Sequence, residues 1–393
     1  MELTVLPLPT IEKLPDTMQA KQLLTEVGSN RAPVGNKQIA AEDDLSAMNT
    51  WLDEYSHTPS TFRVYQKEAE RLLLWCIFNH KKPLSSLNRD DFEAYIQFMQ
   101  DPQPRALWCG RQGGRGNKRG SSNWKPFSSP LNQASLTTAI SIINSLMTYL
   151  VDAGYLQANP LRLLRKAKRR PQLEERKIEV QARILEPEEW EAMLESMNSM
   201  PEATPHEKDE KYRLRFIVAM LYFLGLRVGE LTSHTWNAFQ RINGRWWFIV
   251  RGKGDKLGKV PVNAALLEVV QEFRRQMRMP DLPAHGEDAP LVPSWRHAGG
   301  LQPRAINVLL KRLAVETAER HFQDKPTTQA KLIKFSAHWL RHLSATMQDR
   351  AGIPFAHVRS NLRHQSDETT RTYVHGDEFD RCDMNTYSEG DLD

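Results

Sequence analysis

The sequence predicts a mainly α-helical protein with a small antiparallel β-sheet, divided into two domains. The chain has 393 residues, and a single hydrophobic core stops growing at about 250–300 residues. Apolar residues recur at helical spacing in several segments, whereas strand patterns are confined to the neighbourhood of Val250. Length and periodicity therefore predict two cores, built mostly from helices.

Residues 43–170 are predicted to form the first, all-helical domain. Apolar residues recur with helical periodicity at 61–78 and 136–150. A basic, Gly-rich insertion at residues 102–130 separates these two segments. We expect the insertion to lie between helices of this domain.

Three segments fall outside the two domains. Residues 1–42 have scattered Pro, Gly and small polar positions and no clean period, so we expect an irregular arm. Residues 171–184 are polar, begin with a proline and are typical of a linker. Residues 377–393 form an acidic tail, for which a docking helix and disorder are both open.

The second domain is predicted to span residues 185–376. Its most informative region begins with a helix that ends at Gly225. Its apolar positions are Leu214, Ile217, Val218, Leu221 and Leu224. Gly225 is expected to break this helix, so that Arg227 opens a new helical turn. Glu230 follows three residues later, on the same side of that turn.

A β-hairpin is predicted directly downstream. Asn243-Gly244 is a strong hairpin signal, and residues 246–250 and 259–262 have strand composition. Lys253 then lies on a Gly-flanked loop between the two strands.

Three further helices are expected towards the C-terminus. Ser336 is a candidate N-cap for a helix carrying His338 and Arg341, and Gly352 with Pro354 marks its end and the next start. Ser366, followed by two acidic residues, suggests a third helix start, about two turns before Tyr373.

Six side chains form an ordered set suited to metal-free phosphoryl transfer. In chain order they are Arg227, Lys253, His338, Arg341, His364 and Tyr373. Two guanidinium groups with imidazole donors can stabilise negative charge on a phosphodiester. A Lys near such cations suits general acid work, and a Tyr becomes nucleophilic there. Taken singly, each residue is more often an ordinary surface or core side chain, so the prediction rests on the joint pattern.

This order of Arg, Lys, His-x-x-Arg, His and Tyr resembles the tyrosine recombinase (phage integrase) family over about the last half of the chain. The resemblance implies that Arg227 and Arg341 bind the scissile phosphate. It implies that Lys253 is the general acid and Tyr373 the nucleophile. The remaining members that it implies around the phosphate are His338, His364 and the supporting carboxylate of Glu230.

The resemblance also implies an architecture. It is a two-domain, C-shaped DNA clamp, in which a helical core-binding (SAM-like) domain precedes the tyrosine recombinase catalytic domain. The sequence departs from the family at Arg363, where Gly is usual. A bulky cation there either disturbs the tight turn before His364 or adds a phosphate contact.

Charge supports nucleic acid as the partner. The chain has 53 Lys and Arg residues against 48 Asp and Glu, a net charge of +5. The basic residues that we expect to bind DNA are Arg105, Arg111, Arg115, Lys118, Arg119 and Lys125 in the insertion, and Arg165, Lys168, Arg169 and Arg170 before the linker. Charge runs alone are often solvated loops, but beside a DNA-cleaving site we expect phosphate contacts.

The expected partners are double-stranded DNA with a specific recombination site, a homotetramer on two such sites, and an accessory DNA-bending or directionality protein. No metal or other cofactor is expected, because Cys76, Cys109 and Cys382 lack metal-ligand spacing. We find no signal peptide and no apolar run of the roughly 18 residues that a membrane span needs. The expected location is a bacterial cytoplasm, at the nucleoid, with no membrane partner.

The sequence thus predicts a site-specific DNA recombinase that acts through a covalent 3′-phosphotyrosine intermediate and a Holliday junction. Integration, excision and resolution of mobile DNA all remain open. Two alternatives use similar residues: a type IB topoisomerase that nicks and reseals one duplex, and a non-catalytic DNA-binding protein.

Overall fold

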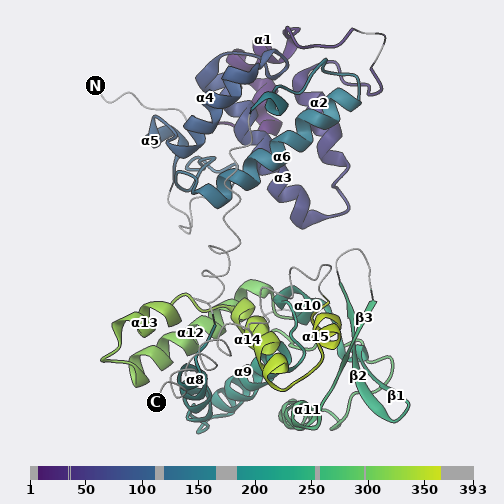
Figure 1. Ribbon diagram of the computed structural model, residues 1–393, viewed down its shortest axis with the longest axis vertical. Coiled ribbons are helices and arrows are strands. Elements are labelled where there is room, and N and C mark those ends of the chain that lie inside the picture. The colour runs from purple at the N-terminus through teal and green to yellow at the C-terminus, as the bar shows by residue number, and fades with distance from the viewer. Residues whose placement is uncertain are drawn as a thin grey trace, which may run out of the picture. The chain divides into compact units, whose positions relative to one another are not determined.

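The computed structural model describes residues 8–33, 35, 37–110, 119–164, 184–252, 257–295 and 298–363. The chain forms two compact units, Met1–Lys168 and Arg169–Asp393, whose elements are labelled in Figure 1. We call them the N-terminal and the C-terminal unit. Each has its own hydrophobic core.

The described part of the N-terminal unit is helical. Its elements are η1 (Ile11–Asp16), α1 (Met18–Thr25), α2 (Asp44–Asp53), α3 (Pro59–Leu74), the π-helical segment η3 (Trp75–His80), η4 (Leu84–Ser86), α4 (Arg89–Gln100), α5 (Arg105–Trp108), α6 (Gln133–Asp152) and η5 (Pro160–Leu163). The 20-residue α6 packs against α2, α3 and α4. It begins where the Asn132 side chain accepts a hydrogen bond from the backbone N–H of Ser135.

Among the described residues, α6 is the helix that is long and apolar enough to cross a membrane. Interspersed Ser, Thr and Asn interrupt its apolar residues, so the sequence shows no continuous apolar run there. Its buried side chains are Leu136, Ala139, Ile142, Ile143, Leu146, Met147 and Leu150. They belong to the core of the N-terminal unit, so we interpret α6 as a core helix.

The N-terminal segment corrects one expectation. Residues 11–25 form η1 and α1 rather than an irregular arm. Leu14 and Ala20 are fully buried in the core, and the backbone N–H of Ile11 donates to the carboxylate of Glu70 in α3. Both elements are too short, and Pro15 too disruptive, to give a clean helical period.

The described part of the basic insertion is also built into this core. Trp108, Trp124 and Phe127 are buried, and Cys109 and Phe127 form an isolated parallel bridge. Three large aromatic side chains anchor the insertion, so its described ends are not a solvated loop.

The C-terminal unit combines helices with one sheet. Its described helices are α8 (Pro187–Asn198), α9 (Pro205–Phe223), α10 (Val228–Ser233), η6 (Trp236–Ala238), α11 (Ala264–Gln276), α12 (Pro303–His321), α13 (Pro326–Leu332), α14 (Ala337–Arg350) and α15 (Phe355–Leu362). Buried residues of α9 include Phe216, Ile217 and Leu221, at the centre of the core cluster. Helix α9 packs against α11, α14 and α8.

The sheet has three antiparallel strands in the order β1-β2-β3. The strands are β1 (Phe239–Ile242), β2 (Arg245–Arg251) and β3 (Leu257–Pro261). Asn243 and Gly244 connect β1 to β2 with φ values of 49° and 77°, as a type I′ turn requires. Phe248 pairs with Phe239 on one side and Val260 on the other, and all three are buried.

The predicted fold class, mainly α-helical with a small antiparallel sheet, is confirmed. Most of the 171–184 linker, the helix predicted around Tyr373 and the acidic tail 377–393 lie outside the described residues.

Candidate active site

The candidate site is built around Gly225, which ends α9. Its φ of 53° lies in the left-handed region that glycine tolerates best. A Cβ atom here would lie 2.6 Å from Cδ2 of Leu362, the last residue of α15. Gly225 therefore both turns the chain and lets the end of α15 approach that turn.

Arg227 is the N-cap of α10, as the sequence predicted for a residue that opens a new turn. Oε2 of Glu230 accepts a hydrogen bond from the Arg227 backbone N–H at 2.8 Å, and Oε1 accepts one from Nη1 at 2.8 Å. The Arg227 side chain stays 50% exposed, whereas that of Glu230 is 8% exposed. A cation at a helix N-terminus opposes the helix dipole, and such ends favour anions. The half-exposed Arg227 is thus placed where a bound anion would relieve this repulsion.

Arg341 reaches the same turn from α14. Its guanidinium donates from Nη1 to the carbonyl oxygen of Gly225, 116 residues away in sequence, and from Nη2 to the carbonyl of Leu362. The residue is 4% exposed. The structure thus brings the upstream and downstream halves of the predicted set together at Gly225.

His338 lies one turn before Arg341 on α14 and is exposed. Its ring centroid is 4.2 Å from that of the buried His342, with the rings nearly perpendicular. Ser336 is the N-cap of this helix, as predicted, although its side chain makes no capping hydrogen bond.

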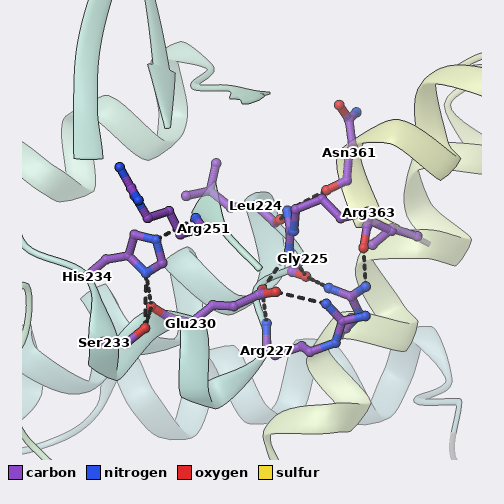
Figure 2. Close-up of polar contacts among 11 residues, drawn as sticks. Leu224, Gly225, Arg227, Glu230, Ser233, His234, Arg251, Asn361 and Arg363 are labelled. Atoms are coloured by element: carbon purple, nitrogen blue, oxygen red, sulfur yellow. Dashed lines mark hydrogen bonds and ion pairs between the residues drawn. The ribbon is translucent and has the colours of Figure 1, made fainter. Parts of the chain in front are cut away.

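Arg363 keeps the tight turn after α15 and turns its side chain inward. Its φ of 54° is left-handed, so the turn survives without the usual glycine. Nη2 donates to Oε2 of Glu230 at 2.8 Å, and the side chain is 10% exposed. Figure 2 shows Arg227 and Arg363 converging on this one carboxylate.

The two arginines determine the charge of Glu230. Burial alone would raise the pKa of its carboxyl group. The charge of Arg363, the hydrogen bonds from the Arg227 backbone and side chain, and the charge of Arg227 outweigh burial and hold the pKa below the ordinary 4.5. Glu230 is therefore ionised near neutral pH.

His234 connects this cluster to the sheet. Its Nδ1 lies 2.7 Å from the carbonyl oxygen of Glu230, and its Nε2 lies 2.8 Å from the backbone nitrogen of Arg251. A carbonyl only accepts and a backbone N–H only donates, so the imidazole is neutral with its proton on Nδ1. Sequence reasoning missed His234, because its role depends on a partner in another element.

Three members of the predicted catalytic set, Lys253, His364 and Tyr373, lie outside the described residues. Their described neighbours border the cluster: Arg251 ends β2 two residues before Lys253, and Arg363 directly precedes His364. Within the described residues, no group of three or more His, Cys, Asp or Glu side chains gathers as a metal site.

Some of the predicted DNA-binding residues also lie outside the described residues. Outside the described residues lie Arg111, Arg115, Lys118, Arg165, Lys168, Arg169 and Arg170. Arg105 forms an exposed ion pair with Asp101, and Lys125 Nζ donates to the carbonyl of Ala106. Arg119 bridges Glu12 and Glu70 at 2.9 and 2.6 Å. Arg119 thus ties η1 and α3 to the insertion, which is a structural task.

A basic groove in the N-terminal unit was not predicted. It has a volume of about 720 Å³, and it is lined by residues of α3, the insertion and the start of α6. Its cations are Arg63, Lys67, Arg71, Arg119 and Lys125, and its carboxylates, Glu68 and Glu70, pair with Lys67, Arg71 and Arg119. Residues 63, 67 and 71 recur every four positions along α3, a helical spacing that could have revealed this face.

Comparison with known proteins adds a family match. Residues 183–378 match the Phage integrase family. The tyrosine recombinase XerC of Vibrio parahaemolyticus serotype O3:K6 is 26% identical over 316 residues, which cover 80% of this chain and 87% of that protein. XerD of Rhizobium meliloti is 29% identical over 166 residues, which cover 42% of this chain and 48% of XerD.

Solved structures share the fold at low identity. The XerH site-specific recombinase in a post-cleavage complex has a TM-score of 0.58 at 16% identity, covering 90% of this chain and 91% of XerH. The Tn1549 transposon integrase has a TM-score of 0.54 at 14% identity, covering 87% of this chain and 99% of that chain.

Proposed function

Because the chain belongs to the phage integrase family, whose members are tyrosine site-specific recombinases, we propose that it cleaves and rejoins duplex DNA through a 3′-phosphotyrosine bond to Tyr373. The chain is a DNA strand-transferring enzyme. The proposal concerns the covalent intermediate and the residues that form it.

The observation that carries the proposal is the meeting of Arg227 and Arg341 at Gly225. Arg341 is locked by two backbone carbonyls, and Arg227 is held by one carboxylate while half of its side chain stays exposed. Two guanidinium groups preorganised in this way suit a phosphodiester, whose non-bridging oxygens gain negative charge during displacement. Losing one such donor typically costs about 10²–10³ in rate.

The reaction that we propose balances without a cofactor. Tyr373 releases its phenolic proton to water and its oxygen attacks phosphorus, the bond from phosphorus to the 5′ oxygen breaks, and Lys253 gives that oxygen a proton. His338 and His364 donate to the phosphate. The phosphotyrosine keeps the energy of the broken bond, so a 5′ hydroxyl of a second strand can attack it and rejoin DNA without ATP.

The proposed partner is double-stranded DNA. The solved XerH structure is a complex with its palindromic difH substrate, and the Tn1549 integrase structure contains transposon right end DNA. In this chain, the basic groove beside α3 supports contacts to phosphates, which displace counterions and strengthen binding at low salt. We propose that both units bind the duplex as a clamp and that four copies act on two sites.

The finer role is part of the same proposal. Strand exchange through a Holliday junction would serve integration, excision or resolution of mobile DNA, with an accessory DNA-bending or directionality protein, at the bacterial nucleoid. A type IB topoisomerase would use the same chemistry on one duplex, and a non-catalytic DNA-binding protein would lack it. The relatives named above are recombinases, which favours the first of the three.

One experiment separates these functions. The purified protein is incubated with DNA that flanks its native gene, and covalent adducts are mapped to find the cleaved site. Two duplexes carrying that site are then combined. We expect exchanged strands and a trapped Holliday junction with four protomers. Relaxation of supercoiled DNA by a monomer without exchange would indicate a topoisomerase, and binding without any adduct would indicate a non-catalytic protein.

A further inference from the structure

Arg363 occupies a place in the backbone that suits glycine better than arginine. It is the C-cap of α15 with a φ of 54°. A non-glycine residue in the left-handed region is strained. The side chain at this position therefore needs a compensating role.

The contacts of its guanidinium are extensive. Nη1 donates to the carbonyl oxygen of Asn361 at 2.6 Å, and Nη2 donates to the carbonyl of Gly225 at 3.2 Å and to Oε2 of Glu230 at 2.8 Å. Arg363 thereby joins the end of α15 to the α9–α10 turn and to the first turn of α10.

The aliphatic part of Arg363 is also accommodated. A Cβ atom on Gly258 of β3 would lie 2.8 Å from Cδ of Arg363. The glycine at 258 leaves room for the arginine stem. Both the end of α15 and strand β3 therefore accommodate an arginine at position 363.

The consequence falls on Arg227. Glu230 has two carboxylate oxygens: Oε1 accepts from the Arg227 side chain, and Oε2 accepts from the Arg227 backbone and from Arg363. Because Arg363 supplies the buried counter-charge, Arg227 needs to give Glu230 only one side-chain nitrogen. The Arg227 side chain stays 50% exposed.

We propose that Arg363 is a positioning residue for Arg227, which acts by neutralising Glu230 and so leaves the Arg227 guanidinium for the DNA phosphate. This inference rests on the proposed function and deepens it, because it adds a residue to the phosphate site. Without Arg363, the buried carboxylate has Arg227 as its remaining cation in this cluster. A paired, two-nitrogen bond to Glu230 then withdraws Arg227 from the phosphate.

Arg363→Gly isolates this role, since glycine adopts the same φ without strain. Single-turnover cleavage is measured at saturating protein on a nicked suicide substrate. The short cleaved fragment dissociates from this substrate, and its loss prevents religation. We expect the cleavage rate to fall about tenfold to a hundredfold, while the DNA dissociation constant stays unchanged. Arg363→Lys should fall in between, because an ammonium is a point charge without the guanidinium fork.

Three controls separate positioning from folding. Arg350→Ala removes an exposed arginine at the end of α14, and it should leave the rate unchanged. Free guanidinium ion, below concentrations that unfold the protein, should restore part of the rate of Arg363→Gly, whereas sodium at equal ionic strength should not. In a Glu230→Gln background, the glycine substitution should add little further loss, since both act through one carboxylate.

The outcomes are distinct. If Arg363→Gly and Arg363→Lys both cleave as fast as the wild-type protein, the inference is wrong. A loss that is fully additive with Glu230→Gln, or one that guanidinium cannot restore in the folded variant, also overturns it. If the wild-type protein forms no adduct, the proposed function fails instead.

Discussion

The imidazole Nε2 of His234 accepts a hydrogen bond from the backbone N–H of Arg251 at 2.8 Å. His234 follows α10 directly, and Arg251 is the last residue of β2, two positions before Lys253. The opposite ring nitrogen donates to the carbonyl of Glu230. One neutral histidine therefore ties the strand that leads to the proposed general acid to the helix that carries Arg227.

The role of Lys253 itself is tested by changing the leaving group. We predict that Lys253→Ala loses cleavage of an ordinary phosphodiester but regains it on a 5′-bridging phosphorothiolate, because the sulfur leaves without needing a proton. Cleavage of both substrates is measured in a single turnover. If sulfur does not rescue the variant, the general acid lies elsewhere, and Lys256 is the next candidate.

The His234 link predicts a related effect. His234→Ala should slow cleavage of the ordinary substrate about tenfold to a hundredfold, because the end of β2 is no longer held near α10. The phosphorothiolate should reduce this defect, since its sulfur does not need Lys253. Thr232→Ala, a change in the last turn of α10, serves as the matched control. An equal defect on both substrates would contradict a role through the Lys253 loop.

Glu230 predicts a pH-dependent stability. Its folded-state pKa lies below 4.5, so its ionised form stabilises the fold above that pH, and this contribution is lost as the pH falls through the folded-state pKa. Glu230→Gln should lower the unfolding free energy at neutral pH by about 1–3 kcal/mol. The gap from wild type should narrow in acid.

Urea denaturation at neutral and acidic pH measures this gap. Glu207→Gln, in the capping box of α9, controls for the loss of a carboxylate at a helix start. A gap for Glu230→Gln that is constant with pH would show that its charge is not what stabilises the cluster.

We predict different effects for alanine substitutions of two arginines in the N-terminal unit. Arg63→Ala, in the basic groove, should reduce the salt dependence of DNA binding by about one counterion, because an exposed phosphate contact is lost. Arg119→Ala should instead lower stability by about 1–3 kcal/mol, since the buried carboxylate of Glu70 loses its ion pair with the partly exposed Arg119.

Binding isotherms across a salt series and thermal melts of both variants distinguish these outcomes. A flattened salt dependence for Arg119→Ala with unchanged melting would return Arg119 to the DNA-binding set and remove its structural role.

These contrasts show what sequence could and could not predict. Local signals worked: Asn243-Gly244 gave the hairpin, and Gly225 gave the break that makes Arg227 an N-cap. The prediction for residues 11–25 was wrong, because two short elements around Pro15 carry no clean helical period and gain their stability from the core.

The polar contacts around Glu230 could not be predicted from the sequence for a different reason. Arg363 meets Glu230, and His234 meets Arg251, only where α15, α10 and β2 pack together. Sequence reveals residue types and helical spacing, but partners that lie in different elements depend on tertiary packing. The same holds for Arg119, whose carboxylates come from η1 and α3.

The central claim is that Tyr373 forms the covalent bond to DNA, and identifying the modified residue tests it most directly. The trapped adduct on a suicide substrate is digested, and the nucleotide-bearing peptide is sequenced by mass spectrometry. We predict that the nucleotide is attached to Tyr373, and that Tyr373→Phe binds the same DNA but forms no adduct. An adduct on another residue, such as Tyr387, or one that persists in Tyr373→Phe, would contradict the account.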